Sequence, residues 1–124
     1  MRVAFTPATP EDFAALIRSQ PVARVRAIAA RLEGELLGVG GFLYQRDGTV
    51  WASMAIAPRG RGFPAAIWRA GVMGMRMAER LGLREVLAVA DKDQPAAGRY
   101  LERLGFTRIG EHKGEPLYRW RRGG

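Results

Sequence analysis

The chain has 124 residues, of which 48% are hydrophobic and 26% are charged, and it contains no cysteine. This length and composition are typical of one globular domain, so we expect a single domain over residues 1–124. The absence of cysteine excludes disulfides, thiolate metal sites and a cysteine nucleophile. The sequence has no apolar run long enough to cross a membrane and no signal-peptide core at its start, which favours a cytoplasmic protein with no membrane partner.

The charge of the chain is strongly positive. Lys and Arg number 20 against 12 Asp and Glu, which gives a formal net charge of +8 at pH 7. A basic surface raises the rate of encounter with anionic partners, among them polyphosphate cofactors, acidic proteins and nucleic acids. A solvated arginine-rich surface gives the same composition. The tail Arg119-Trp120-Arg121-Arg122 is too short to single out nucleic acid, which is therefore not favoured as a partner.

Hydrophobic periodicity and turn residues predict ten elements. They are a strand at 2–6, a helix at 10–19, strands at 22–32, 36–45 and 49–57, a helix at 64–81, a strand at 84–90, a helix at 95–104, and strands at 107–112 and 116–121. Thr9 and Pro10 are typical of a helix start, and Asp47-Gly48 predicts an antiparallel hairpin. This order predicts an α/β (α+β) fold, in which helices flank both faces of a mixed, mainly antiparallel β-sheet.

Glycines occupy positions where they weaken regular structure. Gly71 and Gly74 lie on the apolar side of the helix predicted at residues 64–81, where each lowers helix propensity. We expect them to let this helix lie close against the sheet. Gly38, Gly40 and Gly41 interrupt a predicted strand and indicate bulges or close approach of another backbone.

A basic turn follows the strand at 49–57 and opens the helix at 64–81. It reads Arg59-Gly60-Arg61-Gly62. Glycine lets the backbone approach a ligand closely, and the free N–H groups at a helix start attract negative charge. The arrangement predicts a phosphate-binding turn, although Arg-Gly pairs are common in basic proteins.

Together with the segment from Gln94 to Phe106, this turn resembles the GNAT superfamily of acetyl-CoA-dependent N-acetyltransferases. The family's pyrophosphate loop reads Gln/Arg-x-x-Gly-x-Gly/Ala, and Arg59 and Gly62 match its Arg and first Gly. The family's later segment often reads Asn-x-x-Ala-x-x-x-Tyr-x-x-x-Gly-Phe. The chain matches it in frame from Gln94 to the closing Gly-Phe pair. The resemblance covers most of the chain.

The resemblance implies a fold, a cofactor and a reaction. Acetyl-CoA would lie between the fourth and fifth strands, and the acetyl group would pass directly to a primary amine of a small molecule or a peptide, with no metal. The implied cofactor-binding residues are Ile56, Ala57, Arg59, Gly60, Arg61, Gly62, Phe63 and Gln94. Backbone groups of Ile56 and Ala57 would pair with the pantetheine arm, and the N–H groups of residues 60–63 would face the pyrophosphate.

Three residues depart from the family pattern. Pro64 stands where the loop usually has Gly or Ala, and proline has no N–H to offer a phosphate. The family's tyrosine, which protonates the departing thiolate, falls in frame on Leu101, and Tyr100 is one residue early. We take Tyr100 as the candidate catalytic acid; its alternative role is a ring that packs beside the helix. Ala97, Leu101 and Leu104 should form the core stripe of that helix.

The acceptor side carries few candidate residues. The strand at 49–57 has no carboxylate that could serve as a general base. His112 is the only histidine and would either border the acceptor site or pack at the surface. The single short helix predicted at 10–19 leaves the acceptor groove open, which suits a peptide or a second subunit of a homodimer. Trp51, Trp68 and Trp120 would line such an interface or pack in the core.

Two other functions remain open at this point. The departures at Pro64 and Leu101 favour a GNAT-fold module that binds or assembles without catalysis. The net charge is also compatible with a basic nucleic-acid-binding domain, whose mark would be a steep dependence of binding on salt.

Overall fold

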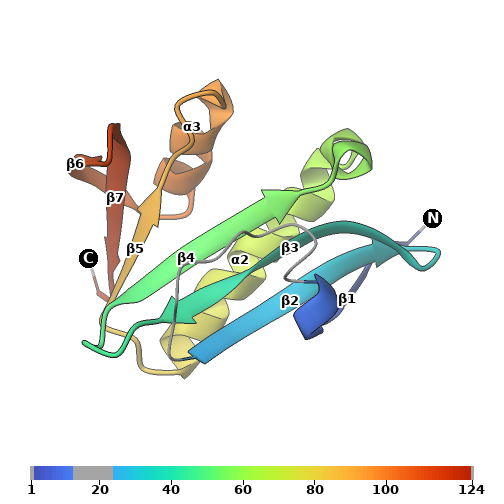
Figure 1. The fold of residues 1–124 in the computed structure, drawn as a ribbon, viewed down its shortest axis with the longest axis horizontal. Helices are drawn as coiled ribbons and strands as arrows, with labels where there is room; N and C mark the ends of the chain where they lie inside the picture. The colour runs from blue at the N-terminus through green and yellow to red at the C-terminus, as the bar shows by residue number, and fades with distance from the viewer. Residues whose placement is uncertain (1, 13–23, 124) are drawn as a thin grey trace.

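The computed structural model describes residues 2–12 and 24–123 (Figure 1). Residues 10–12 are helical, and the further elements are β1 (Ala4–Pro7), β2 (Arg24–Leu32), β3 (Glu35–Tyr44), β4 (Val50–Ile56), the 3₁₀ helix η1 (Pro58–Gly62), α2 (Pro64–Arg80), β5 (Glu85–Val89), α3 (Pro95–Arg103), β6 (Thr107–His112) and β7 (Glu115–Arg121). Every predicted strand is present within the described residues. The first begins two residues later than expected and ends one residue later.

The strands form one seven-stranded sheet in the order β1-β2-β3-β4-β5-β7-β6. Neighbouring strands are antiparallel except β4 and β5, which are parallel. The parallel pair is joined through α2, as expected for a β-α-β unit. The predicted mixed, mainly antiparallel sheet is therefore confirmed.

The helix start predicted at Thr9 and Pro10 is also confirmed. The Thr9 hydroxyl accepts the N–H of Asp12 at 3.1 Å, and the Asp12 carboxylate accepts the N–H of Thr9 at 3.0 Å. This reciprocal arrangement satisfies N–H groups that a helix start leaves without partners. The rest of the predicted helix, residues 13–19, lies outside the described residues, and so does the expectation of an open acceptor groove that rests on it.

The hairpin predicted at Asp47-Gly48 joins β3 and β4. The Asp47 carboxylate accepts the N–H of Thr49 at 2.8 Å, and Gly48 adopts a φ of +91°, a conformation that glycine reaches without strain. Tyr44 pairs with Val50 across the turn. Local turn chemistry therefore sets the register of these two strands.

The helices α2 and α3 lie on one face of the sheet. Side chains alternate between the faces of a strand, and those on this face form the main core, which consists of Phe42, Val50, Ala78, Val86, Ala88, Ala90, Phe106, Tyr118 and Trp120. The stripe predicted on α3, Ala97, Leu101 and Leu104, packs on this core and is confirmed.

The opposite face carries a smaller cluster around Ala29 and Val39. Residues 10–12 lie over that face, where Asp12 pairs with Arg31 of β2 (Figure 1). Helical residues therefore lie on both faces, as predicted. None of the described helices is long and apolar enough to span a membrane.

The prediction for the glycines of α2 needs correction. A Cβ at Gly71 would lie 2.2 Å from the hydroxyl oxygen of Tyr100 and 3.0 Å from a methyl carbon of Leu104, and both residues belong to α3 or its end. A Cβ at Gly74 would meet nothing within 4 Å. Gly71 is therefore required by the contact between two helices rather than by close packing on the sheet. No contact of α2 with α3 or with the sheet requires glycine at position 74.

Candidate functional site

The strands β4 and β5 separate soon after they begin. They share a single register pair, Trp51 with Leu87, whereas β4 keeps seven pairs with β3 on its other side. Beyond Trp51 no described strand pairs with the edge of β4 that faces β5, and the two strands open as a V (Figure 1). An unpaired strand edge offers N–H and C=O groups to a ligand. In open sheets, ligands bind in the crevice beyond the carboxyl ends of such strands.

The 3₁₀ helix η1, which holds the basic turn, is anchored on β3. The Ala57 N–H donates to the Leu37 carbonyl at 2.8 Å. Gly60 is buried, and a Cβ on it would lie 2.2 Å from that same carbonyl oxygen. The sequence suggested that Gly60 brings the backbone close to a phosphate. In the structure, the close approach that requires glycine is to β3.

The N–H groups of the turn are only partly available. Gly60 donates to the Ala57 carbonyl at 2.8 Å, and Phe63 donates to the Gly60 carbonyl at 3.0 Å. Both N–H groups are therefore used inside the coiled turn, a geometry that does not favour the role toward a pyrophosphate that the resemblance implied for them. The first turn of α2 offers other donors, since no described group accepts the N–H of Ala65 or Ala66. A proline at the helix start followed by two alanines was the signal for them in the sequence.

The two arginines of the turn differ in what they contact. The Arg59 guanidinium lies 2.6 Å from the Glu35 carboxylate, and both side chains are about half exposed. Arg61 is exposed and forms no ion pair with any described residue. A Cβ at Gly62 would meet nothing within 4 Å. Arg61 and Gly62 therefore form the accessible part of the turn.

Gln94 lies on the other side of the V, between the end of β5 and the start of α3. Its backbone N–H donates to Asp91 at 3.0 Å and its carbonyl accepts from Ala97 at 2.9 Å. Its exposed side chain forms no capping hydrogen bond on α3. The side-chain amide of Gln94 is thus exposed and has no capping role.

Tyr100 connects α3 to α2. Its hydroxyl donates to the carbonyl of Ile67 at 2.8 Å, and its ring meets the Trp68 ring edge-on at 6.1 Å between centroids. Burial raises the pKa of Tyr100 to about 12. The hydroxyl proton is therefore committed to the backbone of a neighbouring helix. The structure supports the packing role, and the acid role stays a prediction.

Trp51 and His112 meet on the face of the sheet away from α2. Their ring centroids are 5.1 Å apart, and the Trp51 indole N–H is buried without a hydrogen-bond partner among the described residues. Trp51 lies at the vertex of the V because it forms the one pair between β4 and β5. For the other two tryptophans the sequence left open an interface role or packing in the core. Trp120 is buried in the main core, and Trp68 is exposed. No cluster of three or more potential metal ligands occurs within residues 2–12 and 24–123.

Comparisons with known proteins agree on the architecture. No family model matches the sequence, and no curated protein matches it either. Among solved structures, an N-acetyltransferase from Staphylococcus aureus superposes with a TM-score of 0.72 at 15% identity, over 98% of this chain and 99% of that one. An IAA acetyltransferase from Bacillus cereus gives 0.70 at 15% identity, over 97% and 99%. A Bacillus subtilis acetyltransferase in complex with CoA gives 0.70 at 14% identity, over 97% of both chains. The chain therefore has the acyl-CoA N-acyltransferase fold that these acetyltransferases share.

Proposed function

We propose that this protein transfers an acetyl group from acetyl-CoA to a primary amine of a small molecule or a peptide. The observation that carries the proposal is the V between β4 and β5, which has free donors of α2 and Arg61 on one side and Gln94 on the other. Acetyltransferases, one of them in complex with CoA, share the fold. The chemistry of the V suits a ligand with an anionic end and an amide-bearing arm.

Arg61 and the first turn of α2 would hold the pyrophosphate. The N–H groups of Ala65 and Ala66 add to the positive end of the helix dipole, which attracts phosphate. Pro64 removes one donor from this turn. Arg59 contributes less than the sequence suggested, because Glu35 partly neutralises it. The residues present fit a diphosphate, with fewer direct donors than an open glycine turn would give.

The free edge of β4 would hold the pantetheine arm. Ile56 lies at the end of this edge, and its backbone is the first candidate to pair with the arm's amides. Ala57 is a weaker candidate, because its N–H is bonded to Leu37 and its carbonyl already accepts from Gly60. The Gln94 side chain would approach the arm from the β5 side.

The bound cofactor supplies an acetyl thioester, whose carbonyl carbon is already activated toward an amine. The chain positions the amine, and orientation alone accounts for much of the acceleration in such reactions. An N–H on the free edge of β4 would donate to the carbonyl oxygen as negative charge develops there. We place the amine on the side of Trp51 and His112, where the imidazole that lies against the Trp51 ring would accept its proton.

Thermal unfolding with and without acetyl-CoA tests the cofactor site. A ligand at about 100 times its dissociation constant stabilises a native protein by roughly 2.7 kcal/mol, a shift of several degrees in Tm. Arg61→Ala should reduce the Tm shift caused by acetyl-CoA more than Arg59→Ala does, because Arg59 already forms an ion pair with Glu35. Acetyl-CoA-dependent thiol release across a panel of amines and peptides then tests transfer. A Tm shift that neither arginine variant changes would place the cofactor elsewhere.

A GNAT-fold binding or assembly module is the second candidate. Pro64 favours it, and so do the internal hydrogen bonds of Gly60 and Phe63, because each removes a donor that a phosphate would use. The same two measurements separate the candidates. Absence of a Tm shift at millimolar acetyl-CoA, together with absence of thiol release, would support the module.

A further inference from the structure

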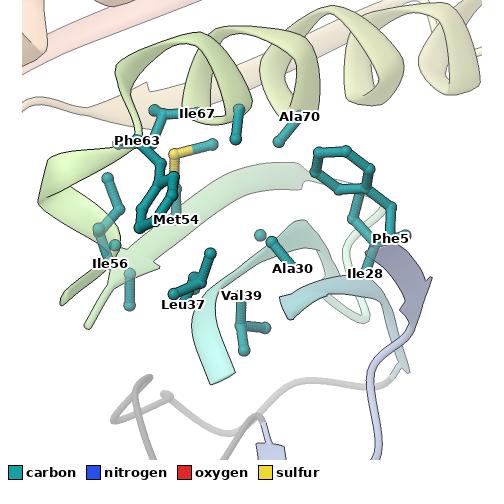
Figure 2. A pocket seen from close by; sticks show the side chains of 15 residues that line it. Phe5, Ile28, Ala30, Leu37, Val39, Met54, Ile56, Phe63, Ile67 and Ala70 are labelled. Carbon is teal, nitrogen blue, oxygen red and sulfur yellow. The ribbon is translucent and has the colours of Figure 1, made fainter. Parts of the chain in front are cut away.

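An apolar pocket lies beneath the N-terminal half of α2. The empty space among its lining atoms is about 410 Å³, a figure that includes the part of the pocket that is open to solvent. Its lining residues come from β1 to β4, η1 and α2, and none of them is charged. Figure 2 shows Phe5 and Ile28 at one end of the pocket and Met54, Ile56 and Phe63 at the other.

Small residues create this space. Ala66 and Ala70 of α2 line the pocket from the helix side. Ala30 and the glycines at positions 38 and 40 line it from the sheet side. A Cβ at Gly40 would make only ordinary contacts, at 3.5 Å from Ser53 and 3.6 Å from Met54. No steric clash therefore demands glycine at this position. Protein interiors are normally close-packed, so the open space under this helix is a place where a ligand could add contacts.

The pocket adjoins the turn that the proposed cofactor site uses. Gly60 and Phe63 belong to the turn after β4 and also line the pocket. Met54 and Ile56 lie on β4, the strand whose other edge faces the V. Met54 is 38% exposed, so its flexible side chain lies at the boundary between the pocket and solvent. An apolar chamber thus adjoins the positive end of α2.

We propose that this pocket binds the apolar acyl chain of a donor longer than acetyl, a medium-chain acyl-CoA. The proposal rests on the proposed function, in that it places the CoA portion at the α2 start and the free edge of β4. Such a donor has an anionic end that fits Arg61 and the free N–H groups, and an uncharged tail that fits the apolar lining. The other occupants that an apolar pocket could take, a second protein or an apolar acceptor, lack the anionic end.

The reaction is unchanged by the longer chain. The amine nitrogen forms a bond to the acyl carbon, the carbon–sulfur bond breaks, and the proton lost by the amine balances the thiolate that leaves as CoA. The pocket fixes the chain and therefore selects the donor, without taking part in bond making.

Calorimetric titration with CoA, acetyl-CoA and octanoyl-CoA tests the proposal in the absence of any acceptor. Each methylene that is buried raises affinity about fourfold. Because the pocket is partly open, we expect octanoyl-CoA to bind at least tenfold more tightly than acetyl-CoA. Equal affinities for the two would overturn the inference while leaving the acetyltransferase proposal standing. Absence of binding by all three ligands would overturn both.

Two variants that fill the pocket locate the acyl chain. Gly40→Leu and Ala70→Leu should each bring the affinity ratio of octanoyl-CoA to acetyl-CoA close to one and leave acetyl-CoA binding within about threefold. Gly74→Leu is the matched control on α2, because a Cβ there meets nothing within 4 Å, and it should keep the wild-type ratio. Two filling variants guard against one that fails to fold, which circular dichroism would reveal. An unchanged ratio in the folded filling variants would place the chain outside this pocket.

Discussion

The two ends of α2 rest on the same face of the sheet in different ways. Near its C-terminal end, Ala78 is fully buried in a core that contains Phe106, Tyr118 and Trp120. Near its N-terminal end, small residues of the helix and the sheet face each other across a pocket. The packed end holds the helix in place, and the hollow end can therefore give up packing without loss of the fold. Stability and ligand binding are assigned to different ends of one helix.

Removal of one aromatic ring from each end tests this division most severely. Phe106→Ala should cost about 3–5 kcal/mol, the usual effect of deleting a buried ring. Phe5→Ala should cost less than half as much, because Phe5 lines the open pocket and is only partly buried. Urea unfolding of both variants measures the difference. Equal losses would mean that the hollow end contributes to stability as much as the packed end does.

The junction between the two ends is tested at Gly71 and Gly74. Gly71→Ala places a methyl group 2.2 Å from the Tyr100 hydroxyl oxygen, and overpacking of this kind costs about 1–3 kcal/mol. Gly74→Ala has open space and should instead stabilise the helix by up to about 1 kcal/mol. Thermal unfolding of the pair gives the sign of each effect. Destabilisation by both would show that the helix, and not the contact with α3, rejects side chains here.

Most of the fold was predictable because its signals are local. Asp47-Gly48 sets a hairpin through its own turn geometry, and Thr9 with Asp12 closes a helix start through bonds three residues apart. The core stripe on α3 followed from helical spacing. These features depend on residues that are close in the sequence, so their pattern can be read without the tertiary structure.

The site was less predictable because it depends on contacts between distant segments. Gly60 is required by Leu37 of β3, and Gly71 is required by Tyr100 of α3. In both cases the sequence shows a glycine but not the atom that excludes a side chain. The pocket was missed for the same reason: Gly40 and Ala70 become neighbours of one space only when α2 packs over β3.

Tyr100→Phe distinguishes a packing role from a catalytic one, and its expected loss of stability is the third largest. Loss of the hydrogen bond to Ile67 should cost about 0.5–1.5 kcal/mol. Burial raises the folded pKa from 10.0 to about 12, so the wild type keeps this contribution below pH 10 and loses it as the pH rises toward 12. The variant should show a flatter decline over that interval. In a thiol-release assay we expect kcat to change little, whereas a loss of about a hundredfold or more would establish Tyr100 as the acid.

Asp12→Asn has the smallest expected effect and tests the face away from both ends of α2. The N–H of Thr9 and the guanidinium of Arg31 hold the pKa of Asp12 below 3.8. The folded state therefore binds this proton less readily than the unfolded state does. The stabilisation is present above about pH 3.8 and is lost as the pH falls through the lowered folded pKa.

The asparagine variant keeps a side-chain oxygen for Thr9 but has no charge to titrate. Its Tm should lie slightly below that of the wild type at pH 7, and the gap should close in acid. A gap that persists at pH 2 would mean that Asp12 acts through packing, and that its ion pair with Arg31 contributes little to holding residues 10–12 against β2.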